Sequence, residues 1–582
     1  MTKNIIKFLS IILLILLIII FYLSTYGINT TQFNSLIKNE VKSYNKNLDI
    51  KVKKVKLILR IKDFSLNVKT LDSLILYKEK NIKISELATN LSIKDYLDDN
   101  FWITNLSIKS NENDIKDIIK IYKSIDNSPQ LFLIDKIVKG GSLVTNIKLN
   151  FDRDGKIKND YEVYGEVKNA KLELLNRDIL NNLKLNFEIK KNNYNLNNIS
   201  LKFNDLDLES EEVEIIKKKK IHLIKGDFKS KKNKIEKNLI SIIPNELASK
   251  FNFENSFFNS DNNFSFDINN KYKINNLKVS SNIYIDKLKY KDNLIKFKNY
   301  LPDFKEYILL SENNFIVEFS KKKLKIEGKS IYSLNDIDNN FSFNINKIKN
   351  NLNFKVDIDL NKLNIKINEL NYLNNKNKKT KLIITGQIQE KKNIIINNLN
   401  YVQENNYIKL KNLILNKDYK VKEIDELKLN YNSVNEIKNN VSLLKNKNKY
   451  ILSGNSFDGI KLIENLTDTS TKGNFFDVFD NLSTEVNVKI NKTYLSKLDH
   501  LNLLNGKLSI ENNKIINATL LSEYSKKDKF LFSIKTSKNG DVVTTLSSGR
   551  AKPFVKNFKF IKGFEKGILD FQSVKKNNIS RS

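Results

Sequence analysis

The chain of 582 residues contains no cysteine and only two histidines, His222 and His500. Without cysteine it can form no disulfide, no cysteine-ligated zinc or iron–sulfur site and no thiol nucleophile. Glycine and proline are also scarce, with 16 and 4 residues, which excludes collagen-like and Pro/Gly-rich disordered chains. The two histidines lie far apart in sequence, and we interpret both as surface or structural residues.

Arginine is nearly missing as well, although the chain is strongly basic. Lys and Arg number 100 against 66 Asp and Glu, but only Arg60, Arg153, Arg177, Arg550 and Arg581 are arginines. Nucleic-acid-binding proteins usually rely on arginine and on a clustered basic patch, whereas these lysines are spread along the whole chain. We therefore expect no nucleic-acid partner. Lysines on the solvent face of strands also oppose edge-to-edge pairing.

One long apolar run is present, at the N-terminus. Phe8 to Leu23 carry no charge, and the run from Ile5 to Tyr26 reaches the ~20 residues that a helix needs to cross a bilayer. Lys3 and Lys7 precede it, which predicts a cytoplasmic N-terminus with the remainder on the far side. The alternative is a cleaved signal peptide, whose apolar core is normally ~7–15 residues. The predicted anchor residues are Phe8, Ile11, Leu14, Leu17, Ile20, Tyr22 and Tyr26.

The rest of the chain alternates apolar and polar residues with the period of two that is typical of strands. The clearest stripe consists of Leu352, Phe354, Val356, Ile358 and Leu360. Leu363, Ile365 and Ile367 extend it after a short break, and similar stripes occur between residues 50 and 108 and between 408 and 429. Clusters of Asn, Asp and Lys stand where turns are needed, so asparagine is expected to replace glycine at tight corners.

Four segments instead have helical spacing. They are residues 33–44, which Thr30 or Thr31 would cap, residues 115–125, residues 235–251 with Pro244 inside, and a segment that starts at Pro302 with Phe304, Tyr307 and Ile308. We interpret them as short helices that plug or cap a sheet.

These patterns predict a mostly β fold: an N-terminal transmembrane helix, then a long curled antiparallel sheet with a few short capping helices. At ~10–12 residues per strand and turn, about 550 residues give on the order of 45–50 strands. Open sheets rarely exceed ~10 strands without curling, so the apolar face should line a trough. The interior is then a packed core or a groove for acyl chains, and the stripe from Leu352 to Leu360 is the candidate lining.

Motifs for chemistry are nearly absent, and we predict no catalytic residue, no metal site, no cofactor and no enzyme activity. Asn150, Asp152, Asp154 and Gly155 match the first half of a calcium loop, but Tyr161 stands where such a loop has glutamate. A hairpin turn with Gly155 at positive φ explains this pattern better.

The order of features resembles the AsmA-like family of inner-membrane proteins, with its YhdP and TamB relatives. The resemblance is carried by the anchor followed by residues 55–66, 82–87, 93–97 and 101–108, by the Gly454–Ile463 segment, and by residues 504–518, 530–534, 547–553 and 560–569, with Gly563 and Gly567 near a corner. It divides the chain into an anchor (1–27), an N-terminal module (28–130), an elongated sheet (131–465) and a C-terminal repeat (466–582). The chain ends soon after Gly567, where relatives usually continue, so a C-terminal truncation is one interpretation.

The resemblance implies a single-pass protein of a bacterial inner membrane, with its bulk in the periplasm. Its implied partners are the inner-membrane bilayer, phospholipid acyl chains and outer-membrane or envelope assembly proteins. Three functions follow for testing: an anchored conduit that shields acyl chains between the two membranes, a structural or assembly factor with a filled interior, and an anchored enzyme. The enzyme would need clustered carboxylates in a polar pocket, which the sequence does not indicate.

Overall fold

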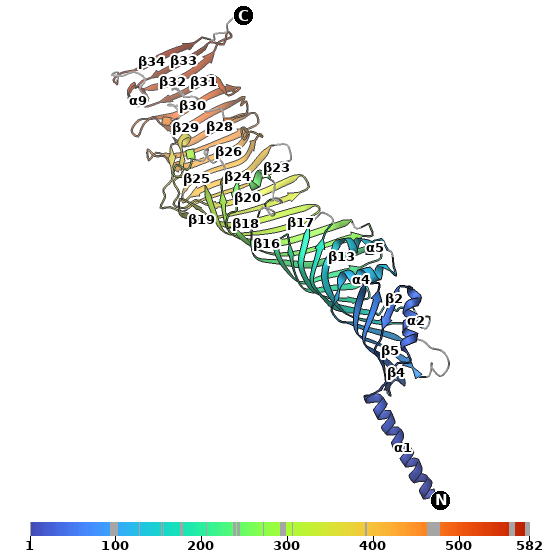
Figure 1. Ribbon diagram of the computed structural model, residues 1–582. Coiled ribbons are helices and arrows are strands. Elements are labelled where there is room, and N and C mark those ends of the chain that lie inside the picture. Colours follow the sequence, from blue (N-terminus) through green and yellow to red (C-terminus); the bar gives the residue numbers. More distant parts are fainter. Residues whose placement is uncertain are drawn as a thin grey trace. The chain divides into compact units, whose positions relative to one another are not determined.

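The computed structural model describes residues 2–93, 103–126, 128–152, 154, 156–174, 178–204, 206–236, 240, 245–271, 273–291, 298–304, 307–389, 393–461, 478–557 and 565–576. This part of the chain is mostly β, with few helices, and hydrogen bonding joins 32 strands into one open sheet (Figure 1). The predicted fold class, a mostly β protein behind one apolar N-terminal helix, is confirmed.

The chain forms two compact units. Unit 1 comprises Met1–Asn233 and Phe258–Ser281, and unit 2 comprises Lys234–Phe257 and Asn282–Ser582. This division does not test the domain boundaries that the sequence predicted near residues 130 and 465, which remain predictions.

Unit 1 begins with the apolar helix α1 (Thr2–Thr25), whose segment Lys3–Thr25 is long and apolar enough to cross a membrane. The helix ends because Gly27 takes a left-handed conformation, with φ of +68°, and donates its N–H to the carbonyl of Tyr22 at 3.1 Å. A Cβ at this position would lie 2.4 Å from the carbonyl oxygen of Leu57, so the chain leaves α1 in close contact with the sheet.

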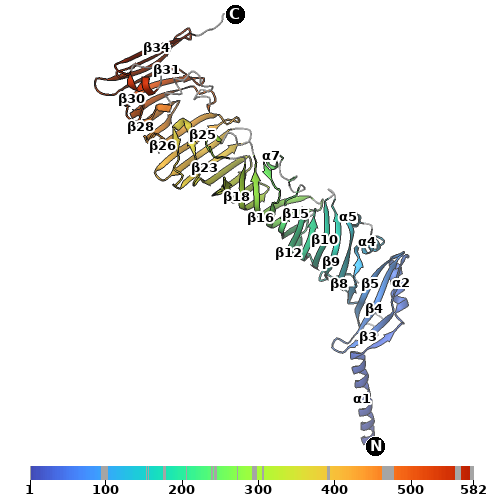
Figure 2. The same cartoon turned by 60° about the vertical axis from the view of Figure 1, so that its left-hand side comes forward.

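The strands of unit 1 follow one another along the sheet (Figure 2). They are β1 (Ile28–Thr30), β2 (Leu48–Lys51), β3 (Lys54–Arg60), β4 (Ser65–Tyr77), β5 (Lys80–Ser92), β6 (Asn105–Ser110), β7 (Asn113–Asp114), β8 (Val138–Asn150), β9 (Glu162–Glu173), β10 (Ile179–Lys190), β11 (Asn193–Phe203), β12 (Leu206–Lys217), β13 (Ile221–Lys234) and β15 (Phe257–Asn269). Strand β16 (Ile274–Tyr290) begins in unit 1 and ends in unit 2.

Unit 2 contains β14 (Phe251–Asn252) and a long series of further strands. They are β17 (Ile308–Ser320), β18 (Lys323–Leu334), β19 (Ile337–Ile348), β20 (Asn351–Asp359), β21 (Lys366–Ile367), β22 (Tyr372–Leu373), β23 (Thr380–Gln389), β24 (Ile394–Gln403), β25 (Asn406–Leu415), β26 (Val421–Asn432), β27 (Lys438–Asn446), β28 (Lys449–Asp458), β29 (Thr484–Tyr494), β30 (His500–Glu511), β31 (Lys514–Glu523), β32 (Lys529–Thr536), β33 (Val542–Ser548) and β34 (Leu569–Lys575).

Successive strands pair antiparallel, as β17 with β18 and β23 with β24 do. One pair differs: β28 and β29 run parallel, with Leu452 opposite Val488. A parallel pair needs a crossover connection, which the long stretch between Asp458 and Thr484 supplies. The sheet is therefore mixed: among the described strands it is antiparallel almost throughout, as predicted, with β28 and β29 as a parallel pair.

Asparagine takes the place of glycine inside the strands. Asn182 in β10, Asn198 in β11 and Asn412 in β25 all have φ near +50°. Asparagine tolerates this left-handed conformation better than most residues. Next to Asn182 the register of β10 against β11 shifts, which marks a bulge that bends the strand. At the turns between strands the same conformation occurs at Asn204 and Asn335 but also at Lys191 and Glu404, so asparagine makes only some of the corners.

The helical segments were predicted with mixed success. Residues 33–44 form α2 (Asn34–Tyr44), but Phe33 precedes the helix and neither Thr30 nor Thr31 caps it by a side-chain bond. Residues 115–125 form α4 (Ile115–Lys123), capped by the carboxylate of Asp114. A further helix that the pattern missed, α5, spans Pro129–Ile137, and α9 spans Lys552–Asn557.

The other two helical predictions stand differently. In the third segment Ile240 and α7 (Asn245–Ala248) are helical, while residues 237–239 and 241–244, with Pro244, lie outside the described residues. The fourth helix does not form over the described residues: Phe304 closes a turn with Leu301, and Ile308 begins β17. Its apolar residues fit either period because the stretch is short.

Candidate functional site

The five predicted lining residues lie at β20 and directly after it. Leu352, Phe354, Val356 and Ile358 alternate along β20 and point to one face of the sheet, while Leu360 follows the strand end and bonds the carbonyl of Thr380. All five are half-buried. Their alternation partners Asn353 and Lys355 lie on the other face and are exposed.

Strand pairing extends this apolar face far beyond β20. Val356 lies opposite Phe343 on one neighbouring strand and Ile384 on the other. Followed from partner to partner, one row crosses sixteen strands of unit 2 without a polar residue: Phe315, Gly328, Phe343, Val356, Ile384, Leu399, Leu410, Leu427, Leu443, Leu452, Val488, Gly506, Leu520, Phe532, Leu546 and Phe571. At ~4.8 Å per strand the row measures about 70 Å along the sheet.

Unit 1 carries a row of the same kind. It crosses ten strands, and its members are apolar except for Thr70 and the hydroxyl of Tyr194. The members are Val55, Thr70, Leu87, Ile108, Ile147, Val163, Ile189, Tyr194, Ile215 and Ile224. Helix α2 covers its first part, because Phe33 and Ile37 pack against the buried cluster of Val55, Val68 and Leu91. Each unit therefore has one continuous apolar face.

Most side chains of the row in unit 2 are only half-buried. Phe343, Val356 and Ile384 keep part of their surface accessible, whereas Tyr401 elsewhere on this face is 6% exposed. Phe354 lies flat, since a Cβ on Gly386 of the adjacent strand would come within 2.6 Å of its ring. The row is therefore partly accessible around Val356, whereas further along it Val488 and Leu546 belong to the main hydrophobic core of the unit.

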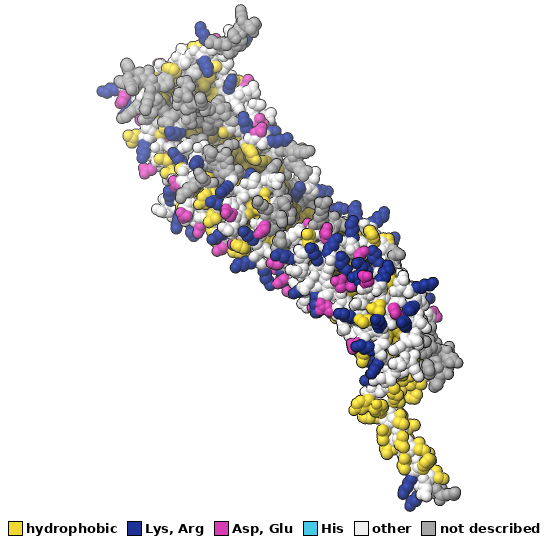
Figure 3. All heavy atoms as spheres, viewed as in Figure 1, with side chains coloured by type: hydrophobic (Ala, Val, Ile, Leu, Met, Phe, Trp, Pro, Cys, Tyr) yellow, Lys and Arg dark blue, Asp and Glu magenta, His cyan; other side chains and the backbone are white. Residues whose placement is uncertain are grey.

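The opposite face is polar and carries many ion pairs. Lys381 pairs with Asp357 at 2.9 Å, and in unit 1 Glu86 forms ion pairs with both Lys69 and Lys109, at 3.6 and 3.3 Å. Figure 3 shows Lys and Arg side chains interspersed with Asp and Glu over the strands. Pairs as exposed as these contribute at most about 1 kcal/mol each, so this face serves solubility more than stability.

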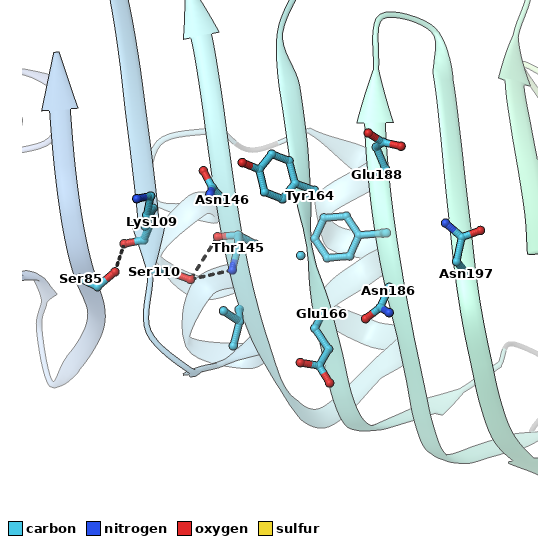
Figure 4. A pocket seen from close by; sticks show the side chains of 13 residues that line it. Ser85, Lys109, Ser110, Thr145, Asn146, Tyr164, Glu166, Asn186, Glu188 and Asn197 are labelled. Atoms are coloured by element: carbon cyan, nitrogen blue, oxygen red, sulfur yellow. Dashed lines mark hydrogen bonds between the residues drawn. The ribbon is translucent and has the colours of Figure 1, made fainter. Parts of the chain in front are cut away.

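A shallow depression of about 530 Å³ lies across β6, β8, β9 and β10 (Figure 4). Tyr164, Glu166 and Glu188 reach it from neighbouring strands, and Ser110 accepts the backbone N–H of Thr145 at 2.8 Å. The serine is bound to a backbone amide and a threonine hydroxyl rather than to a base, so no activated nucleophile is formed here.

One end of the apolar face in unit 2 is filled by the chain itself. After β20 the segment Asn361–Asn374 leaves the main sheet, forms the small hairpin of β21 and β22 around the short 3₁₀ helix Asn368–Leu370, and returns at β23. Its Leu363, Ile365 and Tyr372 are buried in the main hydrophobic core of the unit, against which Ile358 and Leu360 also pack. We call Asn361–Asn374 the plug segment.

Tyrosines bind the plug segment to the sheet. The hydroxyl of Tyr372 lies 2.9 Å from that of Tyr401 on β24, and Tyr431 on β26 donates to the carbonyl of Leu370 at 2.7 Å. Burial raises the pKa of all three hydroxyls, because the phenolate would lose its hydration. The stripe from Leu352 to Leu360 therefore ends in a packed core at Ile358 and Leu360 and runs open towards Leu352.

The plug segment was missed by sequence reasoning. Leu363, Ile365 and Ile367 alternate like a strand, and the extension of the β20 stripe was predicted on that basis. The structure corrects this: only Lys366–Ile367 is a strand, and it pairs with β22 outside the main sheet. The available signal was the interval of twenty residues between Asp359 and Thr380, which is too long for a hairpin loop.

The remaining predicted residues are scattered. The anchor residues Phe8, Ile11, Leu14, Leu17 and Tyr22 are exposed on α1, Ile20 is half-buried, and Tyr26 stacks on Tyr22 at a ring distance of 5.6 Å. His222 and His500 lie in β13 and β30, and the ring of His500 packs near that of Tyr494.

The calcium-like pattern is a turn. The Oδ1 atom of Asp152 accepts the backbone N–H groups of Asp154 and Lys156, and the N–H of Lys158 bonds the carbonyl of Asn150 at 2.7 Å. This is the hairpin that the sequence predicted, and Gly155 lies outside the described residues. Among the described residues no group of three His, Asp or Glu side chains is arranged to hold a metal ion.

Comparison of the chain with known protein families and with curated proteins finds no match to either. The resemblance to the AsmA-like family thus rests on the residue patterns given above, and it enters the argument only as a proposal.

Proposed function

We propose that this is a membrane-anchored protein that shields phospholipid acyl chains along the apolar face of its sheet. One observation carries the proposal: a row without a polar residue crosses sixteen strands of unit 2, and most of its side chains remain partly accessible. A packed core would bury such side chains completely. Acyl chains bound to this face would remove their own apolar surface and that of the sheet from water. Each buried CH₂ group would stabilise the complex by about 0.8 kcal/mol.

The length of the face suits transfer rather than simple storage. A row of about 70 Å is more than twice the ~30 Å thickness of a bilayer core, so it can hold several acyl chains in sequence. Because the face is continuous, a chain could move along it without crossing a polar barrier. The proposal assigns no catalytic role to any residue.

The proposed location is the inner membrane of a bacterial envelope, with α1 as a single span. Lys3 and Lys7 stand before the span and favour a cytoplasmic N-terminus, so the sheet would extend into the periplasm. The AsmA-like pattern of residues 55–108 supports the same placement. Outer-membrane or envelope assembly proteins would be the partners at the far end.

A second function, a structural or assembly factor, is favoured by the plug segment. Tyr372, Leu363 and Ile365 fill one end of the apolar face with protein atoms, as a scaffold with a dry interior would. If such packing extended over the whole face in solution, acyl chains would find no room.

The variant Val356→Asp separates the two functions. On an open face the carboxylate can reach water, so the fold should survive while acyl chains are repelled; in a dry core the same unpaired charge would unfold the region. We expect the purified full-length variant to keep its circular dichroism spectrum and to carry several-fold less phospholipid by mass spectrometry. Lys355→Asp, on the polar face of the same strand, should change neither. Loss of the fold, or unchanged lipid in Val356→Asp, would favour the scaffold.

A further inference from the structure

The turn between β3 and β4 exposes two large apolar side chains beside the N-terminal helix. Phe64 is 71% exposed and Ile61 is 55% exposed. The charged residues of the turn, Arg60, Lys62 and Asp63, are exposed as well, and Arg60 pairs loosely with Asp63 at 3.9 Å. Single exposed apolar residues need no explanation. Tyr26 and Ile28, which join α1 to the sheet, are exposed as well, and β1, which begins at Ile28, pairs with β3.

The register of the strands places this turn level with the last turns of α1. Strand β1 runs antiparallel to β3, with Thr30 opposite Val55 and Ile28 opposite Leu57. Beyond Leu57, β3 therefore continues back past Gly27 in the direction of the helix. Ile61 lies four residues further on, or about 13 Å along an extended strand.

Contacts agree with this placement. Helix α1 and strand β3 are neighbours in unit 1, and Ile20 and Leu23 are half-buried while most other apolar side chains of α1 are exposed. Figure 3 shows hydrophobic side chains running along α1 and continuing onto the base of the sheet where the two meet. If α1 spans a bilayer, the tip of the turn lies at the surface of that bilayer.

The backbone of the turn is unfavourable at Phe64. Phe64 has φ of +46°, a left-handed conformation that a bulky residue adopts only at a cost. The side chain is exposed, so packing inside the protein does not offset this cost. The chain has another exposed aromatic residue in this conformation, Tyr419, so it is the position of Phe64 beside α1 that distinguishes it.

We propose that the β3–β4 turn, residues Ile61–Phe64, inserts into the interfacial region of the membrane leaflet at which α1 emerges. Ile61 and Phe64 would enter the boundary between headgroups and acyl chains, and Arg60 and Lys62 would meet lipid phosphates. Helix and turn together hold the first strands at two points, so the apolar face of unit 1 starts at the lipid surface. This inference rests on the proposed function, because it requires α1 to span the bilayer.

The absence of cysteine makes the test direct. Single cysteines are introduced into the full-length protein at Phe64→Cys, Leu17→Cys and Glu79→Cys, labelled with a fluorophore, and reconstituted into vesicles of phosphatidylethanolamine and phosphatidylglycerol. Quenching by lipids spin-labelled near the headgroup is compared with quenching by iodide in the water. Glu79 is the matched control, because it is exposed in the turn at the opposite end of β4.

We expect the label at position 64 to be quenched several-fold more by the spin-labelled lipids than the label at position 79, and less by iodide. Equal behaviour at positions 64 and 79, with position 17 quenched by lipid, would overturn the inference while leaving the anchor intact. If position 17 also escapes lipid, the anchoring itself fails. Ile61→Asn with Phe64→Asn should lose the interfacial contact without lowering the melting temperature, since asparagine relieves the backbone at position 64.

Discussion

The hydroxyl groups of Tyr372 and Tyr401 lie 2.9 Å apart although 29 residues separate them, and their rings meet edge to face at a centroid distance of 5.8 Å. Tyr372 belongs to the plug segment and Tyr401 to the main sheet. Tyr401 is 6% exposed and Tyr372 1%, so this contact joins the plug segment to the sheet in a dry environment.

Removing one of the two hydroxyls should weaken the plug segment. Tyr372→Phe leaves the Tyr401 hydroxyl without this partner in a buried site, and we expect the free energy of unfolding to fall by about 1–2 kcal/mol. Adding Tyr401→Phe should lower the free energy of unfolding by little more, because it removes the hydroxyl that the first substitution left without its partner. Urea titrations followed by circular dichroism measure both. The control is Tyr419→Phe, at a residue 73% exposed, which should be silent. Strict additivity of the two core variants would mean that the hydroxyls do not interact.

The buried tyrosines should make the protein sensitive to alkali. Burial raises the pKa of Tyr401, Tyr372 and Tyr431 above the usual value near 10, and raises that of Tyr524 to about 12. Between pH 10 and the raised pKa the unfolded chain loses these protons while the folded chain keeps them, so stability is complete below about pH 10 and falls as pH rises. The absorbance of phenolate at 295 nm should show a group of tyrosines that ionise only when the sheet unfolds.

The loss of stability above pH 10 should be smaller in the variant that carries both Tyr372→Phe and Tyr401→Phe. This variant lacks two of the phenol groups whose ionisation is coupled to unfolding. If its stability falls as steeply above pH 10 as that of the unchanged protein, the alkaline sensitivity arises elsewhere.

Leu503 offers a stabilising substitution. It has φ of +51° inside β30, where the register against β31 shifts, and its side chain is 58% exposed. Leu503→Asn should relieve the backbone without loss of packing and raise stability by roughly 0.5–1 kcal/mol. The matched change is Leu501→Asn, at a residue that is 2% exposed. It should destabilise the protein by several kcal/mol, as truncation of a core residue on the order of Leu→Ala does. A destabilised Leu503→Asn would show that the leucine packs against something in solution.

The anchor is tested by extraction. Because α1 presents exposed apolar side chains over its whole length, the protein should stay in the membrane pellet after alkaline carbonate, and protease outside the inner membrane should digest it to near Tyr26. The substitution Leu14→Lys with Leu17→Lys places two charges in the middle of the span and should release much of the protein. A soluble form trimmed at the N-terminus would indicate a cleaved signal peptide.

The strand pattern of this protein could be predicted from its sequence because the period of two is local. Leu352, Phe354, Val356 and Ile358 alternate within one strand, and each polar residue between them faces water. Likewise α1 follows from its uncharged run, and the asparagine corners follow from the shortage of glycine. Each of these features depends on neighbours in sequence alone.

What the sequence could not determine is which strands pair in parallel and where the apolar face is covered. Leu363 and Ile365 alternate as Leu352 and Phe354 do, yet they leave the sheet and are buried in the main hydrophobic core of unit 2. β28 pairs in parallel with β29 across a long connection. Both outcomes depend on contacts between residues far apart in the chain, and the tertiary structure alone decided them. The hydrophobic effect is not directional, so an apolar side chain is stabilised by contact with any apolar surface within reach. Alternation therefore predicts which face is buried but does not predict what covers it.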